Sequence, residues 1–290
     1  MLVIVGAIVV LGSVVAGYVL SHGHLAALWQ PFEVLTICGA AFGGFLASNP
    51  GKVVKRALSG IPALLKGSPY NQAMYLELLS LMFDLFTKAR KEGMMAIEGD
   101  IEEPNESPIF QAYPKIQANH HAIEFITDYL RLVVGGNMNA MELESLMDIE
   151  LESHHHEAES GATAVRAVAD ALPGFGIVAA VLGIVITMGS LGGPVDEIGT
   201  HVAAALVGTF LGILLAYGFV GPWANAMSHM AVAEGKFFEC IKVCIMAQVN
   251  GYAPQIAIEF GRKSLYSTER PSFAELEEHV KNKGKAPAAG

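Results

Sequence analysis

Two apolar segments decide the fold of this chain, PGFGIVAAVLGIVITMGSLGG (173–193) and GTHVAAALVGTFLGILLAYGFVGP (199–222). Crossing the hydrocarbon core of a bilayer, about 30 Å thick, takes roughly 20 residues of α-helix, and each segment is that long. Neither interior contains Asp, Glu, Lys or Arg, and the nearest acidic side chains, Asp196 and Glu197, lie in the connection. The pair is therefore predicted to form a transmembrane helical hairpin.

Prolines mark the same end of both segments, because the chain leaves from Pro173 and returns to Pro222. Pro173 suits the first turn of a helix, where its missing N–H costs nothing. Pro222 lies where a helix would bend, since proline removes one backbone hydrogen bond and clashes with the preceding turn.

Small residues recur every four positions along the second segment, at Ala204, Gly208, Gly212 and Ala216. Such a stripe lets another helix approach closely. Thr187 and Thr209 place hydroxyl groups at membrane depth. Two interpretations stay open. In the first, the hydroxyls form hydrogen bonds within their own helices and the stripe serves only for packing against neighbouring helices. In the second, these residues form a helix surface with isolated polar groups beside an ion path.

Two further spans precede the hairpin. The N-terminal 20 residues are apolar, with no basic region and no cleavage site before a soluble domain, which indicates a retained span rather than a signal peptide. A second span is predicted at 32–49. We find no central carboxylate in the four spans. If ions cross here with proton or sodium coupling, the titrating acid is expected to come from another polypeptide.

Charge placement predicts the topology. All 18 Lys and Arg residues of this 290-residue, 52% hydrophobic chain lie in 52–172 or 223–290. By the positive-inside rule, both long polar regions and both termini are cytoplasmic. The predicted fold is an all-α polytopic membrane protein with four transmembrane helices, in which spans three and four extend into a helical cytoplasmic domain. The expected parts are spans one and two (1–49), a cytoplasmic helical domain (50–172), spans three and four (173–222), and a cytoplasmic extension with a tail (223–290).

The cytoplasmic regions have helical periodicity. Apolar residues on one face predict a helix over 72–91, ended by Gly93, and a second over 120–134. Asn139, with Glu142 three residues later, resembles a capping box that starts a helix running into span three. The fourth span is expected to continue to Asn250-Gly251. The charged tail from Pro271 is expected to be disordered.

Several other functions find little support. Consecutive residues of a helix point about 100° apart, so His154, His155 and His156 are read as part of a solvated acidic face and not as a metal site. No phosphate loop, nucleophile elbow or pair of catalytic carboxylates is present, so the chain is not expected to be an enzyme. A net charge of −10 argues against nucleic acid as a partner.

Two charge clusters of opposite sign are about ten residues apart. Lys88, Arg90 and Lys91 form a basic cluster, and four acidic residues follow, Glu98, Asp100, Glu102 and Glu103. One reading is that they are solvated, or paired with one another or with sister subunits, at little net stability. The other is that they form a two-signed docking face for a charged partner. The sequence alone leaves these two readings open.

The chain resembles the MotA family of flagellar stator subunits, within the MotA/TolQ/ExbB superfamily, almost from end to end. The segments that carry the resemblance include YLELLSLMFDLFTKAR (75–90), LPGFGIVAAVLG (172–183), VGTFLGILLAYGFVGP (207–222) and NGYAPQIAIEFGRKSLYSTER (250–270). Their order and spacing are highly specific.

The resemblance implies a subunit of a proton channel in the bacterial inner membrane. It implies a homopentamer around the single-span subunit MotB, whose aspartate would carry the ion, and no cofactor besides the coupling protons. Pro173 and Pro222 match prolines that couple ion flow to torque, and Thr209 matches a pore-lining hydroxyl, beside which Thr187 is a second candidate. Residues that match the family's contact with the rotor protein FliG are Arg90, Glu98 and, with a weaker claim, Glu150.

Four alternatives stay open. A sodium-driven stator would differ only in its coupling ion. ExbB and TolQ proteins have three spans. A self-contained channel would conduct ions alone, and a passive scaffold would not respond to membrane energisation.

Overall fold

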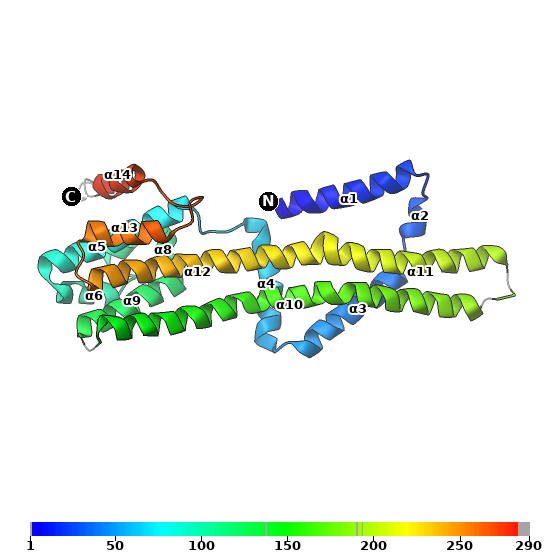
Figure 1. The fold of residues 1–290 in the computed structure, drawn as a ribbon, viewed down its shortest axis with the longest axis horizontal. Helices are drawn as coiled ribbons and strands as arrows, with labels where there is room; N and C mark the ends of the chain where they lie inside the picture. Colours follow the sequence, from blue (N-terminus) through cyan, green and yellow to red (C-terminus); the bar gives the residue numbers. More distant parts are fainter. Residues whose placement is uncertain (1, 137, 190, 193, 284–290) are drawn as a thin grey trace. The chain divides into compact units, whose positions relative to one another are not determined.

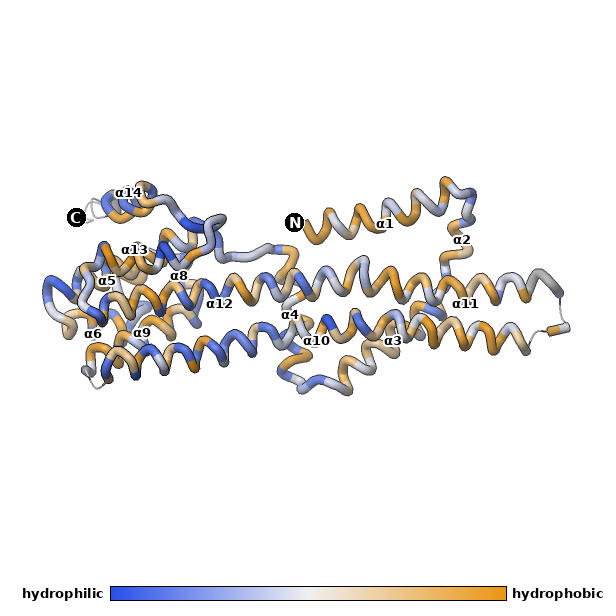
Figure 2. The backbone as a smooth tube through the Cα atoms, viewed as in Figure 1, coloured by the Kyte–Doolittle hydropathy of each residue, from blue (hydrophilic) through white to orange (hydrophobic). Residues whose placement is uncertain are grey.

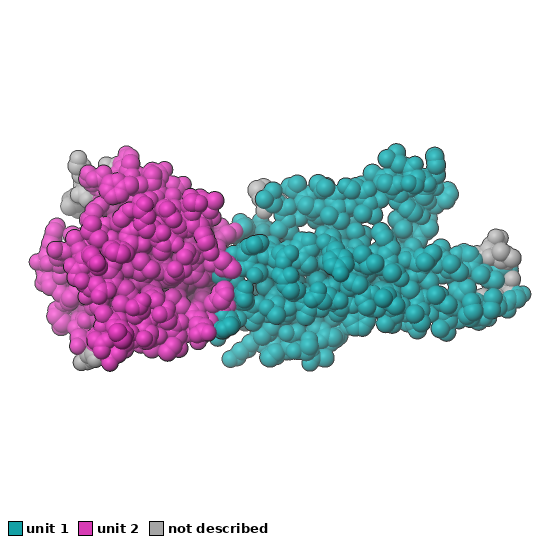
Figure 3. All heavy atoms as spheres, viewed as in Figure 1, with its two compact units in different colours: residues 1–67, 156–231 teal, residues 68–155, 232–290 magenta. Residues whose placement is uncertain are grey.

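The computed structural model describes residues 2–136, 138–189, 191–192 and 194–283, and every regular element in these ranges is a helix. The chain divides into two compact units (Figure 3), with unit 1 made of Met1–Gly67 and His156–Ala231 and unit 2 of Ser68–His155 and Val232–Gly290. One boundary lies between Gly67 and Ser68, and the other two fall inside the long helices α10 (Ala140–Gly189) and α12 (Gly221–Val249). The all-α prediction is confirmed.

Unit 1 contains the apolar helices (Figure 1). Among the described residues, four stretches are long and apolar enough to cross a membrane, Leu2–Leu20, Leu25–Ser48, Ala140–Gly189 and Ile198–Val249, the last two of which extend into unit 2. The elements of the unit, besides parts of α10 and α12, are α1 (Leu2–Leu20), α2 (Leu25–Leu28), α3 (Pro31–Ser48), α4 (Gly51–Lys66), α11 (Val195–Leu215) and the π-helix η2 (Ala216–Val220).

Most large apolar side chains of unit 1 face outward. α1 has no buried residue, and Ile8 and Val9 are 63% and 59% exposed. Figure 2 shows α1, α11 and the second half of α10 as hydrophobic along most of their length. Exposed apolar surface on this scale marks contact with lipid or with other protein. Unit 1 is therefore the membrane part of the protein.

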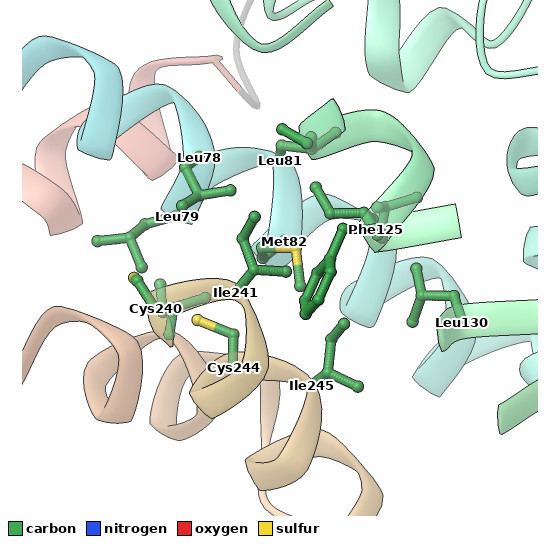
Figure 4. Close-up of a cluster of buried hydrophobic side chains, with 14 of the residues drawn as sticks. Leu78, Leu79, Leu81, Met82, Phe125, Leu130, Cys240, Ile241, Cys244 and Ile245 are labelled. Carbon is green, nitrogen blue, oxygen red and sulfur yellow. The ribbon is translucent and has the colours of Figure 1, made fainter. Parts of the chain in front are cut away.

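Unit 2 is built around α5 (Gln72–Glu92), which has ten buried residues. The other elements are η1 (Met94–Ile97), α6 (Glu98–Glu102), α7 (Pro108–Gln111), α8 (Pro114–Gln117), α9 (His120–Gly135), α13 (Pro254–Ser264) and α14 (Phe273–Lys283), with the ends of α10 and α12. Figure 4 shows side chains of α5, α9 and α12 meeting in one core, among them Leu79, Met82 and Ile241, all with 0% exposure.

Helix ends in unit 2 follow the sequence signals. Asn139 and Glu142 each accept a hydrogen bond from the other's backbone N–H, at 2.9 and 3.0 Å, and α10 begins after this capping box. Gly93 and Gly136 end α5 and α9 at φ of 95° and 65°, angles that favour glycine. The helices predicted over 72–91 and 120–134 are confirmed.

The prediction of a disordered tail from Pro271 is wrong for Phe273–Lys283, which form α14. Leu276 is 2% exposed and packs into the core of unit 2. Ser272 and Glu275 form a second capping box, since the Ser272 N–H donates to Glu275 at 2.6 Å and the Glu275 N–H donates to the Ser272 hydroxyl at 3.2 Å. Val280 packs against the same core, so two apolar anchors and a cap order a charged segment. Residues 284–290 lie outside the described residues.

Candidate functional site

Pro173 lies inside α10 and not at a helix start, so the prediction of a first-turn position is wrong. The flanking residues continue the helix on both sides, and the proline leaves the carbonyl of Ala169 without its usual N–H donor. The break in hydrogen bonding is therefore placed in the middle of a helix, where it can act as a bend.

Pro222 follows a change of helix type. The π-helix Ala216–Val220 comes directly before α12, and the Gly221 N–H donates to the carbonyl of Ala216, five residues back. Such a turn widens the helix where a proline ring would otherwise collide with a carbonyl. The expected bend at Pro222 is thus accompanied by a π-turn. π-Turns inside helices occur frequently at functional sites.

The two interruptions lie at the same level of the helix pair. A methyl group added at Gly221 would lie 3.9 Å from the Cβ of Ala169, whose carbonyl is the one that Pro173 leaves without a helical donor. Pro173 is half-buried and Pro222 is exposed. Both helices of the hairpin are therefore weakened at one depth.

The small-residue stripe packs against α10 of the same chain. A methyl group added at Gly212 would lie 2.7 Å from the carbonyl oxygen of Leu172 and 2.9 Å from the Cα of Gly176. The backbones of the two helices are in contact one turn beyond Pro173. The stripe thus brings a second helix close, as expected, and that helix is the other arm of the hairpin.

The two hydroxyls differ in their surroundings. Thr187 is 1% exposed, and its hydroxyl donates to the carbonyl of Gly183, one turn back, at 2.8 Å. Thr209 is half-buried, next to the stripe residue Gly208. The first interpretation, a hydroxyl that bonds to its own helix, holds for Thr187 in this chain. That either residue lines a pore stays a prediction.

Glu33 lies in the predicted second span, and its position shows that the expectation of no central carboxylate in the four spans is wrong. It lies in the first turn of α3, and a methyl group added at Gly208 would lie 3.0 Å from its Oε2 atom. Gly208 is thirteen residues into α11, which is roughly 20 Å along the helix. The depth of Glu33 follows from the packing of α3 on α11 and not from the position of Glu33 near the start of α3. An ionisable residue in a membrane span is a candidate functional residue.

In unit 2, a buried network joins part of the two charge clusters. Asp100 is 6% exposed and accepts hydrogen bonds from Lys88 Nζ at 2.7 Å and from the Ser107 hydroxyl at 2.6 Å. Arg131 pairs with Glu102 at 2.6 Å, which holds the pKa of that carboxyl below its usual value. The interpretation as mutually paired charges is therefore right for Lys88 and Asp100, whereas Glu102 pairs with Arg131, which belongs to neither cluster.

Arg90 and Glu98 stay outside this network and are exposed. Arg90 lies in the last turn of α5 and Glu98 in the first turn of α6, the helix ends at which each charge is stabilised by the helix dipole. The Lys88–Asp100 pair joins the same two helices, so it fixes the segments that carry both charges.

Glu150 is exposed, and its carboxylate accepts a hydrogen bond from the Tyr129 hydroxyl at 2.6 Å. Burial and this bond raise the pKa of Tyr129. The side chain is therefore held in place by α9.

The reading of residues 154–156 as a solvated face is wrong for His154. Its ring lies 4.6 Å from that of Phe238, centroid to centroid, and its Nε2 lies 3.6 Å from Glu234 on α12. α12 covers this side of α10, which the sequence pattern alone did not indicate.

Comparisons with known proteins agree with this arrangement. The model of the motility protein A N-terminal family matches residues 4–93, and that of the MotA/TolQ/ExbB proton channel family matches residues 117–239. Motility protein A of Salmonella typhimurium is 50% identical over 281 residues, covering 97% of this chain and 95% of that protein. The chemotaxis protein LafT of Vibrio parahaemolyticus is 40% identical, covering 94% and 95%.

Solved structures share the fold. The flagellar MotAB stator complex from Bacillus subtilis superposes with a TM-score of 0.73 at 24% identity, covering 94% of this chain and 97% of that one. The MotAB structure from C. jejuni gives a TM-score of 0.77 at 21% identity, covering 93% and 98%. The N-terminal match and the four candidate spans favour the MotA branch over ExbB and TolQ. The chain belongs to the motility protein A branch of the MotA/TolQ/ExbB proton channel family, whose members form channels and are not enzymes.

Proposed function

We propose that this chain is a stator subunit of the bacterial flagellar motor, which forms a proton channel with MotB and converts proton motive force into torque. Its kinship with motility protein A along nearly the whole length carries the proposal. Several copies, five by family resemblance, surround MotB in the lipid of the inner membrane. Both termini lie in the cytoplasm, and protons are the coupling ion.

The ion-binding acid belongs to MotB. A carboxylate in a medium of low dielectric constant strongly favours its neutral form, so protonation changes how it packs against spans three and four. Thr209 and Thr187 are the hydroxyls that we place beside this path. The switch between the charged and neutral states supplies two arrangements of the helix hairpin.

Pro173 and Pro222 couple this switch to the cytoplasmic part. The missing hydrogen bond in α10 and the π-turn before α12 lie at one depth, so bending there is less costly than elsewhere in the two helices. Both helices continue from the prolines into the cytoplasmic extensions. A change at the ion site can thus reach 140–172 and 223–249 through continuous helix.

Arg90 and Glu98 transmit the movement to FliG, with Glu150 as a further acidic contact. Their exposure, and the Lys88–Asp100 pair that fixes their helices, support this assignment. Opposite charges on one face set the register of a charged partner more than they add affinity.

A charge-reversal experiment tests the rotor contact. Arg90→Glu is expected to reduce swimming at least severalfold, with partial recovery when an acidic residue of FliG is changed to lysine. Lys263→Glu, at an exposed lysine of α13, is the matched control and should swim normally. Absence of recovery in every pairing would argue against contact.

A further inference from the structure

An apolar groove in unit 1 opens beside both proline sites. Its volume is about 310 Å³, at the lower end of the range for ligand pockets. Helices α3, α4, α10 and α12 line it with apolar side chains that include Phe42, Leu58, Leu172 and Trp223. Leu172 precedes Pro173 and Trp223 follows Pro222, so the groove is next to the two helix interruptions.

Helix α4 lies between this groove and a basic pocket. One face packs on α10 and α12 through Ala57 and Leu64, which are 1% and 5% exposed. Lys52, Lys55 and Arg56 border a second cavity of about 700 Å³, whose other side is formed by His156, Glu157 and Ser160 of α10. Helix α4 starts three residues after α3 ends, so its first lysines lie next to this end of the membrane span.

The three basic charges of α4 at this cavity are unequally satisfied. Arg56 is bound to Glu157 of α10, by an ion pair of 3.0 Å and a bond to its carbonyl oxygen. Lys52 and Lys55 are exposed, and neither has an ion-pair partner in the part of the chain that the structure describes. Two lysines next to a membrane span attract anionic lipid headgroups.

Lys55 and Leu58 connect the two features. They are three residues apart on α4 and therefore neighbours on its surface. Leu58 lines the apolar groove, whereas Lys55 borders the basic pocket. A molecule with an apolar chain beside a negatively charged group fits this pairing, because each part meets its complement on the same helix.

We propose that unit 1 binds an anionic phospholipid, with an acyl chain in the groove between α3 and α4 and its phosphate at Lys52 and Lys55. The lipid would fill the space beside Leu172 and Trp223, next to the two helix interruptions. The site depends on the membrane placement of α3 and not on the proposed role in torque.

Trp223 provides a direct probe, because Trp29 is the other tryptophan of the chain. The full chain with its MotB partner, carrying Trp29→Phe, would be reconstituted in vesicles containing acyl-brominated phosphatidylglycerol or phosphatidylcholine at the same mole fraction. Subtracting the emission of a Trp29→Phe, Trp223→Phe double variant isolates Trp223. Brominated phosphatidylglycerol is expected to quench about threefold more strongly.

Variants on α4 separate headgroup recognition from general membrane contact. Lys52→Gln with Lys55→Gln is expected to remove the preference for the anionic lipid and to leave quenching by phosphatidylcholine unchanged. Lys66→Gln, at the far end of the same helix, is the control and should keep the preference. Inorganic phosphate should not reverse the preference any more than chloride at equal ionic strength.

Three results would overturn the proposal. Equal quenching by the two lipids would show that the lysines do not select a headgroup. Absence of quenching by either would show that protein covers the groove. Reversal by inorganic phosphate beyond the chloride control would show a soluble-anion site instead of a lipid site.

Discussion

In α5 of unit 2, ten of 21 residues are buried, whereas α1 of unit 1, which is apolar throughout, has none. The same contrast holds for the units as wholes. Unit 2 closes its apolar residues into one core, and unit 1 keeps most of them on its surface. Apolar burial stabilises unit 2 within a single chain. Unit 1 leaves its apolar surface open for contacts outside the single chain.

The largest effect is expected where unit 1 carries its helix interruptions. Pro173→Leu should abolish motor rotation, because leucine restores the hydrogen bond to Ala169 and stiffens α10. Rotation of tethered cells would measure this, and co-purification with MotB would show intact assembly. Pro62→Leu changes an intrahelical proline of α4 and is expected to keep rotation. Normal swimming of Pro173→Leu would count against the coupling role.

Close backbone contact in the hairpin gives the next effect. Gly212→Val should destabilise unit 1 by about 3 kcal/mol or more, because the added atoms clash with backbone atoms of α10, which cannot move away as a flexible side chain could. The amount of chain in isolated membranes should fall severalfold. Gly44→Ala on α3, with no atom within 4 Å of the added methyl group, should accumulate normally. Equal amounts for the two variants would contradict the predicted packing.

A pair of isoleucines compares the two units directly. Ile245 in unit 2 is 0% exposed and Ile8 in unit 1 is 63% exposed. Ile245→Ala should cost about 2–5 kcal/mol of unfolding free energy, and Ile8→Ala less than about 1 kcal/mol. Thermal unfolding of the purified chain in detergent would measure both. A larger shift for Ile8→Ala would reverse the contrast.

The smallest effect depends on pH and concerns the helix α13. Arg262, which is 8% exposed, donates to Glu259 at 2.6 and 2.7 Å and holds the pKa of this carboxyl below its usual 4.5. The native state therefore favours the ionised form. This stability is complete above about pH 4.5 and is lost as pH falls through the lowered pKa.

Glu259→Gln should therefore cost roughly 1 to 2 kcal/mol at pH 7 and progressively less below pH 4.5. Urea unfolding at several pH values would measure this, and the unfolding free energies of the wild-type chain and the variant should converge as the pH falls. Glu92→Gln, at an exposed glutamate of α5, is the control. A cost for Glu259→Gln that grows on acidification would contradict the assigned sign.

The sequence predicts most of the helices because their signals are local. Gly93 ends α5 through its own backbone preference, and Asn139 starts α10 through atoms three residues away. The exposure of Arg90 and Glu98 agrees with their assignment to a docking face, whereas their contact with FliG stays a prediction.

Features that depend on contacts between helices were not predicted. The π-turn at 216–220 has no pattern of apolar residues in the sequence that would distinguish it from the α-helix around it. His154 is covered by Phe238, which is distant in sequence, and α14 is ordered by Leu276 and Val280 in a charged segment. Glu33 is deeper than its segment suggests because α3 packs on the middle of α11. Long-range packing decides each of these.

The central claim is that this chain supplies the helices of the path and a partner supplies the titrating acid. Proton uptake by sealed vesicles that contain the purified chain alone, under an imposed membrane potential, tests it directly. We predict a rate equal to that of protein-free vesicles. Uptake that is fast in the chain alone and disappears in Glu33→Gln would contradict the claim, since the ion would then be carried by a carboxylate of this chain.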